Sequence, residues 1–272
     1  LIRLAKNKGG VDANDKKFIL LGDPALHLAY PEHEVVTTRI NGEDISGVPD
    51  TLQALRKITI EGEVRSSGSI QEGFNGTVYP IVFDKPSRVT TLAADQTSYQ
   101  RTFDLQNNIL YKGKAQVITG AFNFTFIVPR DIAYQYGFGK ISYYAAADNE
   151  DAHGFYRNIL VGGLDASADP DFTGPEVSLY MNDENFRSGG VTDENPFMLA
   201  FVDDVSGINT VGSGIGHDIV AILDENTEKP IILNDFYESD LNSYSSGSIR
   251  FPFHGLDEGL HSLSLKVWDI FN

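Results

Sequence analysis

The 272-residue sequence contains no cysteine. Within these residues, this absence excludes disulfide bonds, thiolate metal ligands and a cysteine nucleophile. Long apolar runs are also missing, since no stretch approaches the roughly 18 apolar residues of a membrane-spanning helix. No charged segment followed by an apolar one opens the chain. The sequence therefore predicts a soluble protein, or one whose targeting segment lies outside these residues.

Basic residues are scarce, with 21 lysines and arginines against 38 acidic residues and a formal net charge of -17. Such a surface repels phosphate backbones and offers anionic lipid headgroups little to bind. We therefore predict no nucleic-acid partner and no direct membrane insertion. The content of 41% apolar and 22% charged residues is ordinary for a folded protein, and the length predicts about two domains.

The stretch Phe18 to Pro31, FILLGDPALHLAYP, separates a helical pattern from a chain that is almost entirely of strand type. Residues 18–21 are an unbroken apolar run, typical of a strand covered on both faces. Gly22, Asp23 and Pro24 then specify a sharp turn. Residues 1–8 read as the end of an amphipathic helix. We interpret residues 1–33 as the remnant of an α/β domain whose other strands are missing from this chain.

Residues 34–163 have the period-two pattern and the turn spacing of an antiparallel β-sandwich. Phe122, Phe124 and Phe126 place three rings on one strand face, which indicates a sandwich interior. Residues 45–55 read as an irregular passage that includes one helical turn. The expected strands are 35–40, 57–65, 77–83, 88–92, 101–106, 114–119, 121–128, 140–146 and 157–161, with a turn at Asn41-Gly42.

A second sandwich is predicted for residues 175–272, which stop directly after a strand and are interpreted as C-terminally truncated. Residues 164–174 are rich in Gly, Asp and Pro and predict the linker between the two sandwiches. The expected strands of the second sandwich are 177–181, 197–202, 218–223, 231–233, 248–253 and 260–270. The predicted fold class is thus mainly β: two immunoglobulin-like antiparallel sandwiches preceded by a short α/β remnant.

No residue pattern supports catalysis. His217 lies in GSGIGHDI, but the glycine spacing matches no nucleotide-binding fingerprint, so a loop between strands is the better interpretation. His27, His33, His153, His254 and His261 show no metal-binding spacing, and no serine lies in a G-x-S-x-G motif. Tyr134, Tyr136, Tyr143 and Tyr144 lie close in sequence; adjacent Tyr143 and Tyr144 are expected to point to opposite faces of a strand.

Loop carboxylates raise the hypothesis of a calcium site, because calcium takes many oxygen ligands. The candidate clusters are Asp148 to Asp151; Asp165, Asp169 and Asp171; and Asp203-Asp204. The calcium-loop template with its glycine and terminal glutamate is absent, and 38 acidic residues cluster in part by chance. The sequence therefore leaves the presence of a metal unknown, and we predict no other cofactor.

The order of a helix end, a buried strand and the LGDP turn before sandwich domains resembles the end of the catalytic domain in gingipain-like cysteine peptidases. The strings DTLQALRKITIEGEV, FNGTVYPIVFDK, GAFNFTFIVPRDI, KISYYAAADNEDAHG, GIGHDIVAILDE and EGLHSLSLKVWDIFN look like the region after the peptidase in the sortase of the bacterial type IX secretion system. This resemblance runs over nearly the whole chain.

The resemblance implies a parent enzyme at the outer surface of the cell that removes C-terminal sorting domains from secreted cargo and attaches the cargo to anionic lipopolysaccharide. Its catalytic cysteine and histidine would lie upstream of Leu1, so no catalytic residue is carried onto this sequence. The implied partners are the upstream catalytic domain and the secreted cargo or other secretion-system components. The alternative that remains open is a stand-alone surface adhesin or carbohydrate-binding module.

The resemblance also implies one modification site. Bacteria with this secretion system often glycosylate Asp-Ser/Thr-apolar sites on exported proteins, and Asp50-Thr51-Leu52 has that form. Thr51 is therefore a candidate for O-glycosylation.

Overall fold

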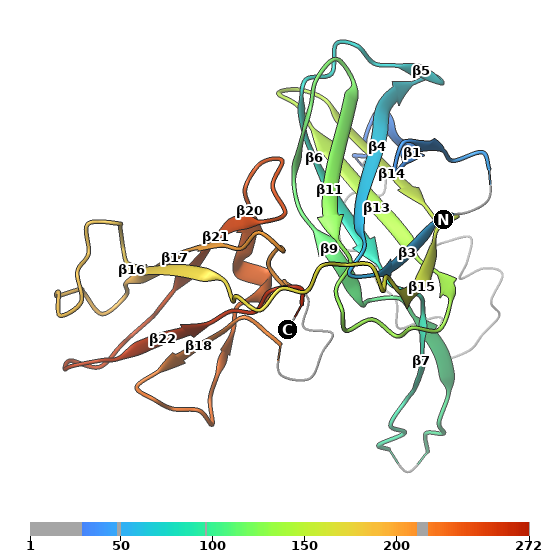
Figure 1. Cartoon of the computed structure of the whole chain (residues 1–272). Helices are drawn as coiled ribbons and strands as arrows, with labels where there is room; N and C mark the ends of the chain where they lie inside the picture. The colour runs from blue at the N-terminus through green and yellow to red at the C-terminus, as the bar shows by residue number, and fades with distance from the viewer. Residues whose placement is uncertain (1–28, 48–49, 96, 211–216, 272) are drawn as a thin grey trace, which may run out of the picture. The chain divides into compact units, whose positions relative to one another are not determined.

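The computed structural model describes residues 29–47, 50–95, 97–210 and 217–271 (Figure 1). The chain divides into two compact units, Leu1–Pro31 and Glu32–Asn272. The helix, strand and turn expected within residues 1–28 lie outside the described residues. The described residues of the second unit form strands and one short 3-10 turn at Asn234–Phe236, which confirms the predicted mainly β class. Among the described residues, no helix is long and apolar enough to cross a membrane.

Fifteen strands between residues 33 and 164 form what we call the first strand set. Their bounds are β1 (His33–Ile40), β2 (Glu43–Asp44), β3 (Thr51–Ala54), β4 (Lys57–Ser66), β5 (Ser69–Ile70), β6 (Gly76–Phe83), β7 (Ser87–Thr90), β8 (Thr102–Leu105), β9 (Ile109–Lys112), β10 (Ala115–Val117), β11 (Ala121–Ile127), β12 (Gly137–Phe138), β13 (Lys140–Ala146), β14 (Asp151–Tyr156) and β15 (Leu160–Leu164).

The main sheet of the first strand set has the order β10-β6-β13-β14-β1-β4-β11. Its two end strands are consecutive in the chain and touch through a bridge between Ile118 and Ala121. All of these pairs are antiparallel except β1 with β14, which are parallel. β1 therefore joins β4 on one side to β14 on the other and makes one continuous sheet from strands far apart in sequence.

The interior of the first strand set is aromatic at its centre. Phe122, Phe124 and Phe126 are buried on one face of β11, as their alternation predicts. The ring of Tyr111 on β9 stacks on Phe126 at 4.8 Å and on Phe124 at 5.7 Å between centroids. The prediction for the adjacent tyrosines is also confirmed, since Tyr143 is buried against this cluster and its neighbour on β13 is exposed.

The second strand set lies between residues 176 and 266. Its strands are β16 (Glu176–Met181), β17 (Phe197–Asp203), β18 (Val220–Leu223), β19 (Ile231–Ile232), β20 (Tyr237–Ser239), β21 (Ser246–Pro252) and β22 (Leu263–Lys266). They form two antiparallel sheets, β16-β17-β21-β20 and β19-β18-β22. A separate hydrophobic core fills this set, centred on Met198, Ala200, Ile219, Leu233 and Ile249.

Five short strands (β2, β5, β9, β12 and β20) lie outside the expected strand ranges, and two further differences bear on the architecture. Residues 45–55 were expected to be irregular with one helical turn, but Thr51–Ala54 is strand β3, which pairs in parallel with β15. No strand was expected at Asp151–Tyr156, yet β14 lies at the centre of the main sheet. Both strands depend on pairing with distant segments, which local periodicity does not report.

Gly154 is one reason why the sequence of β14 shows little apolar alternation. A Cβ at this position would collide with the backbone carbonyl of Val35 on β1. The close approach of β14 to β1 therefore requires a residue without a side chain. Ala152, fully buried on the same strand, is also small. The residues that make this strand fit are those that carry the least hydrophobic signal.

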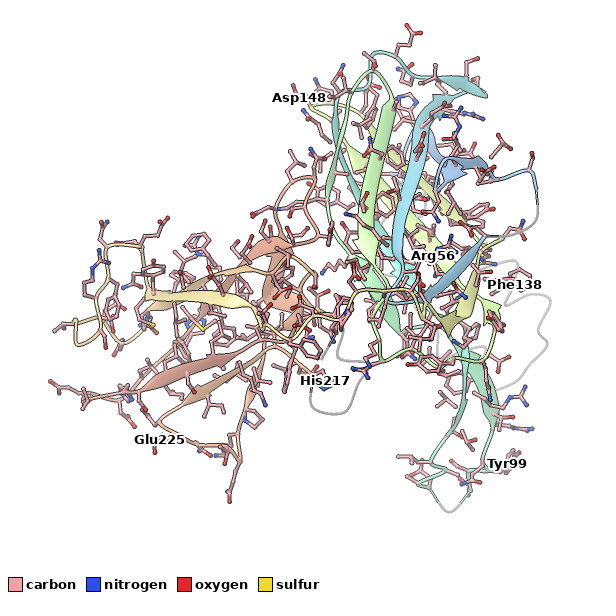
Figure 2. All side chains as sticks on the ribbon, viewed as in Figure 1. Arg56, Tyr99, Phe138, Asp148, His217 and Glu225 are labelled. Atoms are coloured by element: carbon pink, nitrogen blue, oxygen red, sulfur yellow. The ribbon has the colours of Figure 1, made fainter. Side chains whose placement is uncertain are left out.

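The hairpin of β7 and β8 pairs only with itself among the described residues. Its residues Phe103 and Leu105 are exposed, as is Tyr99 near its far end (Figure 2). The guanidinium of Arg101 lies 4.9 Å from the centre of the Tyr99 ring. A two-stranded ribbon without a third strand has little stability of its own in water.

We predict that Gly154→Ala lowers the free energy of unfolding by about 1–3 kcal/mol, because the added methyl group must push β14 away from β1. Urea denaturation of the purified chain measures this change. Gly73→Ala is the matched control, since a Cβ on Gly73 meets nothing within 4 Å. Equal stability of the two variants would show that the tight contact between β1 and β14 is not required.

Candidate functional site

Three carboxylates from distant parts of the chain come together in the structure. Asp171 lies in the strandless segment before β16, Asp204 directly follows β17, and Asp269 lies three residues beyond β22. One carboxylate oxygen from each lies within 4.8 Å of the others. Asp204 and Asp269 are buried, and Asp171 is half-buried. The ends of three strands thus build one acidic cluster, which we call the aspartate cluster.

Local turns hold each carboxylate of the aspartate cluster in place. The Asp204 side chain accepts a hydrogen bond from the Ser206 backbone N–H at 2.7 Å. Asp171 accepts from the backbone N–H of Thr173 at 2.9 Å and from its hydroxyl at 2.7 Å, and it also accepts from the Ser206 hydroxyl. Asp269 accepts from the backbone N–H of Phe271 at 2.8 Å. Hydrogen bonds within each loop, together with the bond from Ser206 to Asp171, therefore hold the carboxylates in place.

Two members of the aspartate cluster differ in how readily they take up a proton. Burial raises the pKa of Asp204 to about 6, and the charges of Asp269, Asp171 and Asp203 add to the rise. Hydrogen bonds from Ser206 and Thr173 lower the pKa of Asp171 to about 2. Asp171 therefore stays ionised at neutral pH, whereas Asp204 resists carrying a negative charge.

The chemistry open to the aspartate cluster follows from its charge. No lysine, arginine or histidine in the described part of the chain forms an ion pair with Asp171 or Asp204. A proton on Asp204, or a hard cation bound by carboxylate oxygens, can reduce the negative charge of the aspartate cluster. Asp171, Asp204 and Asp269 are the residues that could hold such a cation.

The other acidic clusters of the sequence do not assemble in this way. Asp148 projects from the loop that joins β13 to β14 (Figure 2), where Glu150 pairs with His33 at 2.7 Å. Asp165 accepts hydrogen bonds from Ser167 within its own turn. Sequence reasoning missed Asp269, because it lies between apolar residues in VWDIF. The signal that could have identified Asp269 was an acidic residue within an otherwise apolar strand pattern.

The His217 ring lies between a carboxylate and an aromatic ring. Its Nδ1 contacts the carboxylate of Asp131, and its ring lies 4.9 Å from the ring of Trp268. His217 lies just before β18, in agreement with its expected place between strands. Two other histidines have carboxylate partners: His33 with Glu150 and His261 with Asp224.

The two strand sets contact each other within the unit Glu32–Asn272. The backbone N–H of Asn242 donates to the carbonyl of Lys114 at 3.0 Å, and the side-chain oxygen of Asn242 accepts from the Gln116 N–H at 2.8 Å. The guanidinium of Arg130 donates to the carbonyl of Phe271 at 3.1 Å. These bonds include backbone groups on both sides, so they tie the edge of β10 and the segment after β11 to the second strand set.

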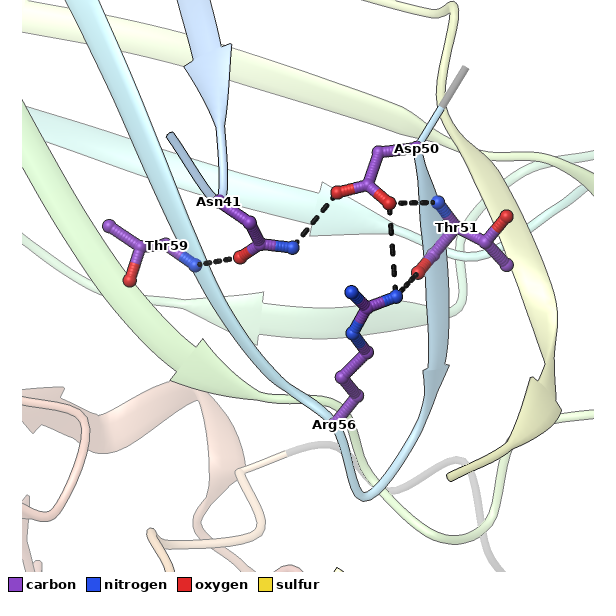
Figure 3. A network of polar contacts seen from close by, with 5 residues as sticks. All are labelled: Asn41, Asp50, Thr51, Arg56 and Thr59. Carbon is purple, nitrogen blue, oxygen red and sulfur yellow. Dashed lines mark hydrogen bonds and ion pairs between the residues drawn. The ribbon is translucent and has the colours of Figure 1, made fainter. Parts of the chain in front are cut away.

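Thr51, the candidate glycosylation site, lies at the start of β3 beside a fixed carboxylate (Figure 3). Asp50 accepts from the Thr51 backbone N–H at 2.7 Å and from the Asn41 side chain at 2.9 Å, and its carboxylate lies 3.8 Å from the Arg56 guanidinium. The Thr51 side chain is half-buried and points away from Asp50 and Arg56. The structure thus leaves part of this side chain open to solvent.

An open polar groove of about 760 Å³ lies over strands β1, β4 and β11. Its floor carries two ion pairs, Arg39 with Glu61 at 3.4 Å and Arg65 with Glu63 at 2.9 Å. Because each guanidinium already has a carboxylate partner, the groove presents mixed charge rather than a basic surface.

No protein-family model matches this chain, and no relative is found among curated proteins. Among solved structures, the crystal structure of dimeric latent PorU from Porphyromonas gingivalis matches with 34% sequence identity and a TM-score of 0.55. The match covers 100% of this chain and 26% of the PorU chain. This chain is similar to PorU from end to end. It spans about a quarter of the PorU length, so the likeness is to a segment and not to the whole of PorU.

Two further structures match more weakly than PorU. A marsupial T cell receptor has 9% identity and a TM-score of 0.23, with 86% of this chain and 99% of that chain covered. The sporulation control protein Spo0M from Bacillus subtilis has 11% identity and a TM-score of 0.28, with 82% and 91% covered. At these scores neither match establishes a shared fold, so neither is used as support for the likeness to PorU.

We predict that the stability contribution of Asp204 falls as pH rises from about 4 to 6. Its folded-state pKa of about 6 lies above the ordinary value of 3.8, so the native state binds more protons than the unfolded state in this window. At pH 7, Asp204→Asn should raise the free energy of unfolding by about 1–3 kcal/mol, with allowance for nearby water. Urea denaturation at pH 4.5 and pH 7 measures the effect.

The adjacent Asp203→Asn is the matched control, because Asp203 is exposed. An equal gain in stability in both variants would contradict a buried charge at Asp204.

The same assay tests the calcium hypothesis. Binding by the aspartate cluster would raise the stability of the unaltered chain at pH 7 when calcium is added, with reversal by a chelator, and Asp204→Asn would remove the gain. An unaltered chain that does not respond would eliminate calcium.

Proposed function

We propose that this chain is the non-catalytic, C-terminal part of a PorU-like, surface-exposed cysteine endopeptidase of the gingipain type. The end-to-end likeness to a PorU segment carries the proposal. The absence of cysteine supports it, because no cysteine nucleophile can lie within these residues. The proposed parent enzyme processes the C-terminal signal domains of type IX secretion cargo and attaches the cargo to the cell surface.

The strand pairing supports two immunoglobulin-like modules within this chain. The order β16-β17-β21-β20 corresponds to strands A, B, E and D of that architecture, and β18 with β22 corresponds to C and F. In the first strand set, β1, β4 and β11 pair as A, B and E, and β6, β13 and β14 pair as C, F and G. Under this proposal the same plan occurs twice along the chain.

The proposed physical task is to brace the catalytic domain and to hold it or the cargo in position. The hydrogen bonds of Asn242 with Lys114 and Gln116, and that from the Arg130 guanidinium to the Phe271 carbonyl, favour this task, since they couple the two strand sets. The net charge of -17 favours basic faces on the partners through electrostatic steering. The partners under this proposal are the upstream catalytic domain and the secreted cargo or other secretion-system components, at the outer membrane surface.

Deleting residues 33–272 from the full-length protein should abolish removal of cargo signal domains in the source bacterium, because the catalytic domain would lose its support. Mass spectrometry of secreted cargo measures the retained signal domain. A second strain that lacks only residues 175–272 distinguishes the two modules. An immunoblot for the catalytic domain shows whether that domain is still present, and so distinguishes loss of bracing from degradation. Full cargo processing in either deletion strain would show that the deleted residues are not required.

A glycan array with the purified chain decides between bracing and the alternative adhesin or carbohydrate-binding function. Clear glycan binding would favour the adhesin or carbohydrate-binding function, whereas the bracing task requires no glycan binding.

We also propose that Thr51 carries an O-linked glycan in the native protein. Its support is the Asp50-Thr51-Leu52 form and the partial exposure of the side chain. Mass spectrometry of protein from the native source should show a glycan mass on the peptide with Thr51 and none on the Thr51→Ala variant. An unmodified Thr51 peptide would end this proposal without affecting the bracing function.

A further inference from the structure

The strands β6, β13 and β14 lie side by side in the main sheet (Figure 1), and exposed aromatic rings project from their outward face. Tyr79 on β6 pairs with Tyr144 on β13, and Phe155 lies on β14 opposite Ser142. The three aromatic residues keep 44%, 46% and 65% of their surface exposed. A single exposed ring is ordinary, whereas a contiguous apolar patch marks an interaction site. We call the outward side chains of these strands, with Arg157 directly after β14, the outer aromatic face.

One end of the outer aromatic face is cationic. Lys140 begins β13 and Arg157 directly follows β14, and these strands pair antiparallel, so both cations lie at the same end. The Arg157 guanidinium lies 4.9 Å from the centre of the Phe155 ring, which places it on the same side of the sheet as the exposed rings. The Lys140 ammonium lies 4.3 Å from the centre of the Phe83 ring. Both cations therefore border the apolar rings, whose faces attract positive charge.

The opposite end of the outer aromatic face is acidic. Asp151 begins β14, and its carboxylate accepts a hydrogen bond from the Tyr144 hydroxyl at 3.4 Å. This bond places the Asp151 side chain on the same side of the sheet as the exposed rings. Among the described residues, Asp151, Lys140 and Arg157 form no ion pair. The two ends of the face thus carry opposite charges that are not matched within that part of the chain.

A two-fold axis brings these two ends together. On β14, Asp151 lies three residues before Gly154, and Arg157 lies three residues after it. When two copies face each other across a two-fold axis that crosses the strands at Gly154, Arg157 of each copy lies over Asp151 of the other. Gly154 has no side chain and its cross-strand partner Tyr143 points into the core, so neither residue on the axis projects toward the other copy. A two-fold interface uses one patch twice and must complement itself, as this face does.

We propose that the outer aromatic face pairs with the same face of a second copy of this chain. The two sheets pack face to face with their strands running in opposite directions, and the exposed rings of each copy are shielded from water. Two ion pairs between Arg157 and Asp151, one at each end, set the register of the two copies. A partner of uniform charge, or a neutral glycan, matches at most one end of the face, whereas a second copy matches both.

The size of the outer aromatic face and the net charge make this pairing weak. Residues 151–157 span about 20 Å, and three strands span about 15 Å. Such a patch is smaller than the roughly 800 Å² that each partner buries in a stable complex. The net charge of -17 opposes approach, but salt screens exposed charges more than about 8 Å apart at physiological ionic strength. We therefore expect dimers in concentrated solution and monomers in dilute solution.

Sedimentation equilibrium of the chain at physiological salt, from about 10 μM to about 1 mM protein, measures the dimer. Arg157→Asp and Asp151→Arg each place like charges against each other at both ends of the interface, and each should weaken the dimer at least about tenfold. The double variant re-forms both ion pairs with reversed polarity and should recover to within about threefold of the unaltered chain. Thermal melting followed by circular dichroism confirms that each variant is folded.

Arg88→Asp is the matched control, because Arg88 is exposed and pairs with Asp104 on the separate β7–β8 hairpin. It should leave the dimer unchanged. A chain that stays monomeric up to about 1 mM would overturn the proposal, as would a control as weak as Arg157→Asp or a double variant as weak as either single variant. Glycan binding by the monomer that Tyr144→Ser removes would also overturn it and assign the face to a carbohydrate. A monomeric chain would leave the proposed bracing function untouched, because that function rests on the likeness to PorU.

Discussion

The simultaneous pairing of β1 with β4 and β14 is the interaction on which the first strand set depends. It joins strands separated by most of this part of the chain, and it is possible only because Gly154 lets the β14 backbone lie against Val35. The small residue Ala152 allows the same approach without a void. The aromatic cluster of β11 and Tyr143 then fills a closed interior instead of one open between β1 and β13.

In the second strand set, no strand of the described residues joins β16 to β22. The inward residues of its inner strand β17 are buried, whereas β16 and β22 leave apolar residues partly exposed, as do Leu223 on β18 and Phe251 on β21. The hydrogen bonds from the Gln116 N–H on β10 to the Asn242 side chain and from the Arg130 guanidinium to the Phe271 carbonyl anchor the second set to the first.

The aspartate cluster concentrates charge where the ends of β16, β17 and β22 meet. Its two titration shifts have opposite physical origins, since burial opposes the charge on Asp204 while hydrogen bonds favour the charge on Asp171. The candidate site was therefore only partly accessible to sequence reasoning. Asp171 and Asp204 stood out as loop acids but appeared in separate clusters, and Asp269 was hidden inside an apolar strand end.

The sequence by itself determined the mainly β class, most strand positions and the exclusion of a cysteine nucleophile, because alternation and composition are local properties. Phe122 to Phe126 predicted a buried face in this way, and Asn41-Gly42 predicted a turn in which both residues have positive φ. The tertiary structure alone decided the place of β14, the meeting of Asp171, Asp204 and Asp269, and the outer aromatic face of β6, β13 and β14. Each of these depends on backbone segments far apart in sequence approaching within bonding distance, and no local pattern encodes which segments will meet.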